Sequence, residues 1–205
     1  MTRRWAAAAA VGVVGPATFV AAWAVLGART AGYDPTRDAI STLAAVDAST
    51  RHLMTAGLAV LGTGMVLYAG ALRKGLGGPA WIAALANGIT TFGIAALPLG
   101  STYDTPHGVA AGLGYATLAA IPLLAAPRLA GAGRPGWAAA SRALGVVSGL
   151  CLAASVVGDW RTGLLQRLGL TLAHAWVVAS AVSLARGPMS SSTTPPAPAP
   201  AGRRR

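Results

Sequence analysis

The sequence is poor in charged residues, in cysteine and in histidine. Only 10% of its 205 residues are charged, against about 25% in a typical soluble domain, and glutamate is absent. The single cysteine, Cys151, excludes an intramolecular disulfide and any metal site built from cysteines. Cys151 lies inside an apolar run, so we interpret it as a small packing residue. A soluble fold is therefore a poor description of this chain.

Long, uninterrupted apolar runs dominate the sequence instead. Hydrophobic residues make up 54% of the chain. A helix that crosses a hydrocarbon core of roughly 30 Å needs about 20 apolar residues in succession. We identify six such runs, at residues 5–26, 52–72, 79–99, 107–126, 141–158 and 164–185. The sequence thus predicts an all-α, polytopic membrane helix bundle with six transmembrane helices.

The predicted membrane domain covers residues 1–186. Two arginines precede the first run, as in a signal peptide, but the run is too long and no small-residue cleavage site follows before Arg29. We therefore interpret the first run as a retained span. Residues 187–205 are rich in Ser, Thr, Pro and Ala, which cannot bury a core, so a disordered cytoplasmic tail is expected there.

Lysine and arginine are distributed unevenly between the two ends of the predicted bundle. Of the 16 basic residues, eleven fall on the side of the chain termini and five on the other side, together with all five aspartates. Because cytoplasmic loops carry the excess of Lys and Arg, we expect a multi-pass protein of the plasma membrane with both termini cytoplasmic. The net charge of +11 then comes from basic residues at the ends of the spans, where they set membrane orientation. Nucleic-acid binding is therefore not expected.

The first predicted outer loop, residues 29–51, is the longest connection between spans. Asp34, Arg37, Asp38 and Ser41 lie in it, with Tyr33-Asp34-Pro35 typical of a turn and Asp38 positioned to begin a short helix. Long loops are often functional, so these four side chains are candidates for a lid over a cavity between the helices. The alternative is a solvated loop whose charged groups pair only with one another.

The second predicted outer loop contains Asp104 and His107, three residues apart at the start of the fourth span. Asp104 is a good candidate for a helix cap, with Pro106 in the first turn. The same spacing would let a carboxylate orient an imidazole for proton transfer or metal binding.

Several polar side chains fall inside the predicted spans. His174 lies roughly 10 Å into the sixth span, where an ionisable group is costly and should face the bundle interior or a cavity. Arg167 and Thr171 share its face by spacing. Asn87 forms a polar patch on the third span, and Ser155 and Asp159 belong to a polar stripe on the fifth span. These groups either line a pocket open to the outside or form hydrogen bonds between helices, typically worth about 0.6 kcal/mol each.

Two segments carry a resemblance to a known family. The run Tyr33–Leu43, followed by a span that opens near His52, resembles the bacterial and archaeal membrane family catalogued as domain of unknown function 998. The segment Leu97-Pro98-Leu99, followed by Asp104 and His107-Gly108, is similar to that family's second outer loop. The resemblance extends over about residues 7–185. It implies a six-helix arrangement but supplies no reaction, cofactor or oligomeric state.

Three functions are compatible with these features. The first is binding or transport of a lipid or small apolar molecule through an outward-facing polar pocket. The second is a membrane-embedded hydrolase or transferase acting on lipid at the outer leaflet, with Asp38, Ser41, Asp104, His107 and His174 as catalytic groups. The third is a structural or assembly partner of another membrane protein. A metal site at His107 and His174 would need a carboxylate as third ligand, and we assign no metal-ligating residues.

Overall fold

The computed structural model describes residues 3–157 and 161–189, and within these ranges it contains helices and no strand. Its elements are α1 (Arg3–Arg29), η1 (Ile40–Ala44), α2 (Arg51–Gly75), α3 (Ala80–Ala96), α4 (Asp104–Gly131), α5 (Pro135–Val157) and α6 (Thr162–Arg186). The predicted all-helical architecture is confirmed. Asp159 and residues 190–205, most of the predicted tail, lie outside the described ranges.

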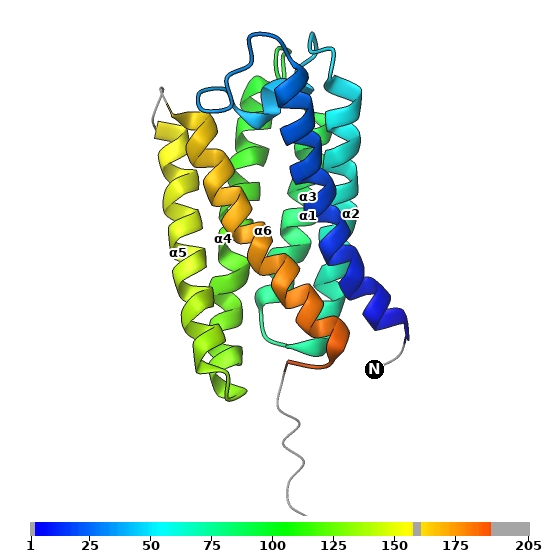
Figure 1. Cartoon of the computed structure of the whole chain (residues 1–205), viewed down its shortest axis with the longest axis vertical. Helices are drawn as coiled ribbons and strands as arrows, with labels where there is room; N and C mark the ends of the chain where they lie inside the picture. Colours follow the sequence, from blue (N-terminus) through cyan, green and yellow to red (C-terminus); the bar gives the residue numbers. More distant parts are fainter. Residues whose placement is uncertain (1–2, 158–160, 190–205) are drawn as a thin grey trace, which may run out of the picture.

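The six α-helices run up and down and form a closed ring. Each helix packs against its neighbour in sequence, and α6 closes the ring against α1 (Figure 1). α6 also contacts α2 and α4 across the ring, whereas α5 packs mainly against α4 and α6. α6 is therefore the element best placed to bring residues from distant parts of the sequence together.

The two ends of the bundle differ in what they carry. At one end α1 begins, α6 ends, and short connections join α2 to α3 and α4 to α5 (Figure 1). We call this the basic end, because Arg73, Lys74, Arg128 and Arg134 lie there. The opposite end, called the loop end, carries residues 30–50 and the α3–α4 connection.

Five of the helices are long and apolar enough to cross a membrane: residues Ala10–Arg29 of α1, and α2, α4, α5 and α6. Their outward-facing side chains are apolar, as in Leu53, Leu150 and Val156, each at least 65% exposed. Such a surface suits lipid and not water. The chain is therefore a multi-pass integral membrane protein. α3 has 17 residues and is the shortest of the α-helices.

The connection between α4 and α5 is shorter than predicted. The predicted fourth span ends at residue 126 and the predicted fifth span starts at residue 141, but α4 continues through Pro127 to Gly131, and α5 begins at Pro135. Proline is tolerated within helices that neighbours support, so it did not end α4. The turn itself is confined to three residues and uses Gly133 at a φ of 72°.

Candidate functional site

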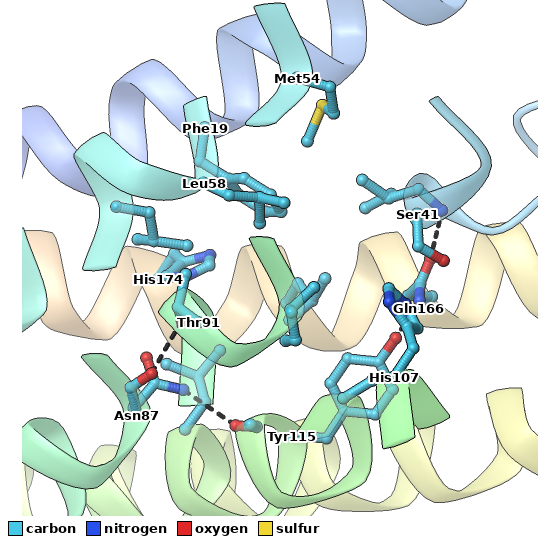
Figure 2. Close-up of a pocket in the computed structure, with 17 residues that line it drawn as sticks. Phe19, Ser41, Met54, Leu58, Asn87, Thr91, His107, Tyr115, Gln166 and His174 are labelled. Carbon is cyan, nitrogen blue, oxygen red and sulfur yellow. Dashed lines mark hydrogen bonds between the residues drawn. The ribbon is translucent and has the colours of Figure 1, made fainter. Parts of the chain in front are cut away.

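A cavity lies inside the bundle toward the loop end. Its volume is about 60 Å³, and α1, α2, α3, α4, α6 and η1 all contribute to its walls (Figure 2). The apolar part of the wall comprises Phe19, Ile40, Met54, Leu58, Leu61, Ile94, Ala111, Leu118 and Leu170, with Gly114. The polar part comprises Ser41, Asn87, Thr91, His107, Tyr115, Gln166 and His174. No acidic, lysine or arginine side chain lines the cavity among the described residues.

The loop that follows α1 forms the roof of this cavity and is attached to the start of α6. The amides of Gly163 and Leu164 donate to the carbonyls of Arg37 and Thr36, at 3.2 and 3.0 Å. A Cβ atom on Gly163 would lie 2.5 Å from the Asp38 carbonyl oxygen, so only glycine permits this approach. The loop thereby satisfies amides at the N-terminus of α6 that have no partner within the helix.

The side chain of Arg167 holds the same loop through hydrogen bonds. Its Nη1 donates to the carbonyl oxygens of Pro35, Asp38 and Gly163 at 2.7, 2.9 and 2.9 Å, and its Nη2 donates to the Tyr33 hydroxyl. The guanidinium also lies over the Trp23 ring, 5.2 Å from its centroid. Arg167 is only 8% exposed, and arginine stays charged, so these bonds compensate the loss of hydration.

His174 and Asn87 line the cavity with unused hydrogen-bonding atoms. Each is 3% exposed, and neither ring nitrogen of His174 nor the Oδ1 of Asn87 has a partner. The Nδ2 of Asn87 donates to the Gly114 carbonyl at 2.9 Å, which fixes the orientation of the amide. The His174 ring packs edge-on against Phe19, with 5.7 Å between ring centroids. These are the unsatisfied polar atoms of the cavity wall.

Gln166, Tyr115 and His107, nearer the loop end, are hydrogen-bonded to other groups of the protein. Gln166 accepts the amide of Ile40 at 2.7 Å and donates to the Tyr115 hydroxyl, which connects η1, α4 and α6. His107 donates from Nδ1 to the Leu97 carbonyl at 2.6 Å. Ser41 adds a hydroxyl from the roof. In this set most side chains already have a hydrogen-bond partner in the protein, whereas the His174 ring has none.

The charged residues of the 30–50 loop lie outside the cavity. Asp34 accepts the hydroxyl and the amide of Thr36 at 2.7 and 2.8 Å, and these hydrogen bonds lower the pKa of its carboxyl. Arg37 forms an exposed ion pair with Asp34 at 3.6 Å, and Asp38 accepts the Asp34 amide at 2.7 Å. Burial raises the pKa of the neighbouring Tyr33 hydroxyl. These carboxylates shape the loop and do not reach the cavity wall.

The other predicted residues are placed as follows. Asp104 is exposed and accepts the amides of Gly100 and Ser101 at 2.8 and 3.4 Å, so it caps the preceding turn and not α4, and it does not bond His107. Thr171 is exposed and lies off the cavity, although Arg167 and His174 are buried. The Ser155 hydroxyl donates within α5 to Leu152 at 2.7 Å. Asp159 lies outside the described residues.

The cavity thus unites three of the predicted catalytic residues, Ser41, His107 and His174, with Asn87. Sequence reasoning missed Gln166 and Tyr115. Gln166 carried a detectable signal, because an uncharged amide inside an apolar run of α6 seeks a partner in the bundle. Tyr115 carried none, since an isolated tyrosine in an apolar run is equally typical of lipid-facing positions.

The cavity is suited to holding an uncharged molecule. No group of three or more His, Cys, Asp or Glu side chains within the described ranges could hold a metal ion. Its apolar walls favour hydrocarbon, while the free atoms of His174 and Asn87 offer both a donor and acceptors.

A known family model matches most of the chain. The model of a family described as "protein of unknown function (DUF998)" matches residues 13–183. No curated protein and no solved structure matches the chain.

Proposed function

The chain belongs to the DUF998 family, and we propose that it is a binding or transport protein for a lipid or small apolar molecule, which occupies the cavity beneath the 30–50 loop. One observation carries this proposal: a largely apolar cavity whose buried wall leaves polar atoms of His174 and Asn87 without partners. Each such atom costs about 1–3 kcal/mol when it is left unpaired. A bound guest that reaches these atoms removes this cost.

We further propose that all six α-helices span the plasma membrane, with the basic end in the cytoplasm. α3 is just long enough to span a membrane, because its 17 residues rise about 26 Å and a spanning helix needs at least about 17 residues. The Lys and Arg residues of the basic end support the orientation. The cavity would then lie in the outer half of the bilayer, and residues 1–186 would form one membrane domain.

A membrane-embedded hydrolase or transferase is the second candidate, because Ser41, His107 and His174 line one cavity. A serine nucleophile would require a base within hydrogen-bond reach. Neither Asp38 nor Asp104 lines the wall, so the carboxylate that would orient such a base is not among the lining residues. This argues for the binding proposal over the enzyme.

Native mass spectrometry of the full chain, purified in a mild detergent, tests the proposal. We expect a co-purifying uncharged molecule in the wild type and its loss in Ala111→Phe, which fills the cavity from α4. Ala116→Phe adds the same ring to the exposed face of α4 and should retain the molecule. A bare wild-type protein, or identical spectra for the two variants, would contradict the proposal. Release of hydrolysis products would favour the enzyme.

A further inference from the structure

The polar groups of the cavity fall into two sets separated by apolar wall. Figure 2 shows His174, Thr91 and Asn87 on one side of the cavity, and Ser41, His107, Tyr115 and Gln166 on the other. Thr91 donates its hydroxyl to the backbone carbonyl of Asn87 at 2.8 Å, so it is already satisfied. The fully buried polar atoms of the wall that lack a partner are therefore gathered in one region, formed by α3 and α6.

The free atoms have a definite donor and acceptor character. A neutral imidazole offers one N–H donor and one nitrogen acceptor, and the Oδ1 of Asn87 offers a second acceptor. No acidic side chain lines the cavity among the described residues, so nothing there stabilises an imidazolium. A guest that satisfies these atoms must both donate and accept hydrogen bonds.

We infer that the His174–Asn87 region recognises an uncharged hydroxyl group at one end of an apolar guest. This inference rests on the proposed binding function and specifies the class of ligand. A hydroxyl donates one hydrogen bond and accepts others within a single heavy atom. A carboxylate, phosphate or amine would bring a charge into a wall without a counter-charge, at a large cost in desolvation.

The size of the cavity restricts how much of the guest it holds. A volume of about 60 Å³ exceeds the roughly 10–15 Å³ that one water molecule needs, and it is smaller than the cavity of about 150 Å³ that holds benzene in another protein. The hydroxyl group and the first carbons of a chain fit within this space. The hydroxyl belongs either to a free short alcohol or to a lipid whose remaining chain lies outside the cavity.

The test is photolabelling of the purified full chain with an eight-carbon alkanol that carries a diazirine. The detergent must lack hydroxyl groups, so an amine oxide replaces a maltoside. We expect saturable labelling of peptides from α3 and α6. We expect 1-octanol to compete about tenfold better than octane, which corresponds to the net value of roughly one to two hydrogen bonds, and octanoate to compete poorly. Competition by 1-butanol against 1-hexadecanol separates a free alcohol from a lipid.

Three variants connect the preference to the side chains. His174→Phe keeps a ring of similar size and should reduce the preference for octanol over octane to less than about twofold. Thr171→Val makes its change on the same helix, at an exposed position that does not line the cavity, so the tenfold preference should persist. If His174→Phe does not fold, as judged by size-exclusion chromatography and tryptophan fluorescence, His174→Gln takes its place and should keep part of the preference.

The outcomes separate the two proposals. Saturable labelling with equal competition by octanol and octane would overturn hydroxyl recognition and leave apolar binding intact. An unchanged preference in His174→Phe, or stronger competition by octanoate, would also overturn it. Absence of saturable labelling in the cavity would overturn both proposals.

Discussion

At the scale of single residues, Arg167 is the clearest case of a charge retained inside an apolar bundle. Its guanidinium makes hydrogen bonds with three backbone carbonyls and the Tyr33 hydroxyl, and it lies over the Trp23 ring. No carboxylate pairs with it in the described part of the chain. Backbone carbonyls of the 30–50 loop thus stabilise the cation, and the cation in turn holds the loop over the cavity.

Replacing Arg167 by methionine should therefore loosen the roof of the cavity. The change leaves the part-buried carbonyls of Pro35 and Asp38 without their donor, at up to about 1–3 kcal/mol for each. We expect amide hydrogen exchange in residues 36–46 to accelerate by at least about tenfold, as measured by mass spectrometry.

The control for this prediction is Arg37→Ala in the same loop. Arg37 has a side chain that is 74% exposed and an ion pair of 3.6 Å with Asp34, worth at most about 1 kcal/mol. Exchange in the loop should change little. Equal exchange in the two variants would mean that Arg167 does not hold the loop.

The burial of individual residues could be predicted only in part. The depth of His174 in an apolar run correctly indicated a side chain facing the interior. Thr171 was assigned to the same face, since a helix turns about 100° per residue and this places it about 40° from Arg167. It is exposed, because spacing gives angles between residues of one helix but not the positions of the neighbouring helices.

At the scale of elements, glycine determines how closely the helices pack. Gly108 and Gly112 on α4 have the spacing of a close-packing pair, but a Cβ atom added to either would meet no atom within 4 Å, so the pair does not pack against another helix of this chain. Close approaches lie at other glycines, and one of them is between α2 and α3. A Cβ on Gly88 would lie 2.9 Å from the Gly62 carbonyl oxygen and 3.1 Å from the Val66 amide nitrogen.

Gly88→Ala should therefore separate α2 from α3 and destabilise the bundle. Backbone atoms cannot move aside as a flexible side chain can, so we expect a cost of about 1–3 kcal/mol and a lower melting temperature by tryptophan fluorescence. Gly112→Ala makes the same chemical change in open space on α4. It should be neutral or stabilising, because alanine favours a helix by about 1 kcal/mol over glycine. A similar loss in both variants would refute close packing at Gly88.

The helices themselves could be predicted from the apolar runs, but their ends could not. The predicted fifth span starts at residue 141, whereas α5 begins at Pro135. The first turns of α5 extend beyond the apolar run, and the loop between α4 and α5 needs only three residues. Hydropathy measures the part of a helix that suits lipid, and a helix continues past it wherever backbone hydrogen bonds can still form.

At the scale of the whole molecule, an even number of antiparallel helices places the start of α1 and the end of α6 at one end of the bundle (Figure 1). The family relationship and the helical bundle were both predicted from the sequence and are confirmed. The cavity was not located from the sequence, because it depends on how α3, α4 and α6 face one another. No local pattern encodes that arrangement.

The proposed orientation predicts the behaviour of reporter fusions in a bacterial host. Alkaline phosphatase, which folds only outside the cytoplasm, should be active when joined after Ala45 or Tyr103, at the loop end. It should be inactive after Gly77 or Gly133, at the basic end, where a fluorescent protein should report instead. Phosphatase activity at the basic end would show that the orientation is opposite to the one proposed. If α3 spans the membrane, the fusion after Gly77 must be inactive and the fusion after Tyr103 must be active.

The central claim is that the cavity beneath the 30–50 loop holds a guest, and a crystal structure grown from a lipidic phase tests it most directly. We predict non-protein density bounded by Leu58 and Leu118, with an atom within hydrogen-bond distance of His174 and of Asn87. A cavity closed by the collapse of its own side chains, with His174 bonded to a protein group, would contradict the claim.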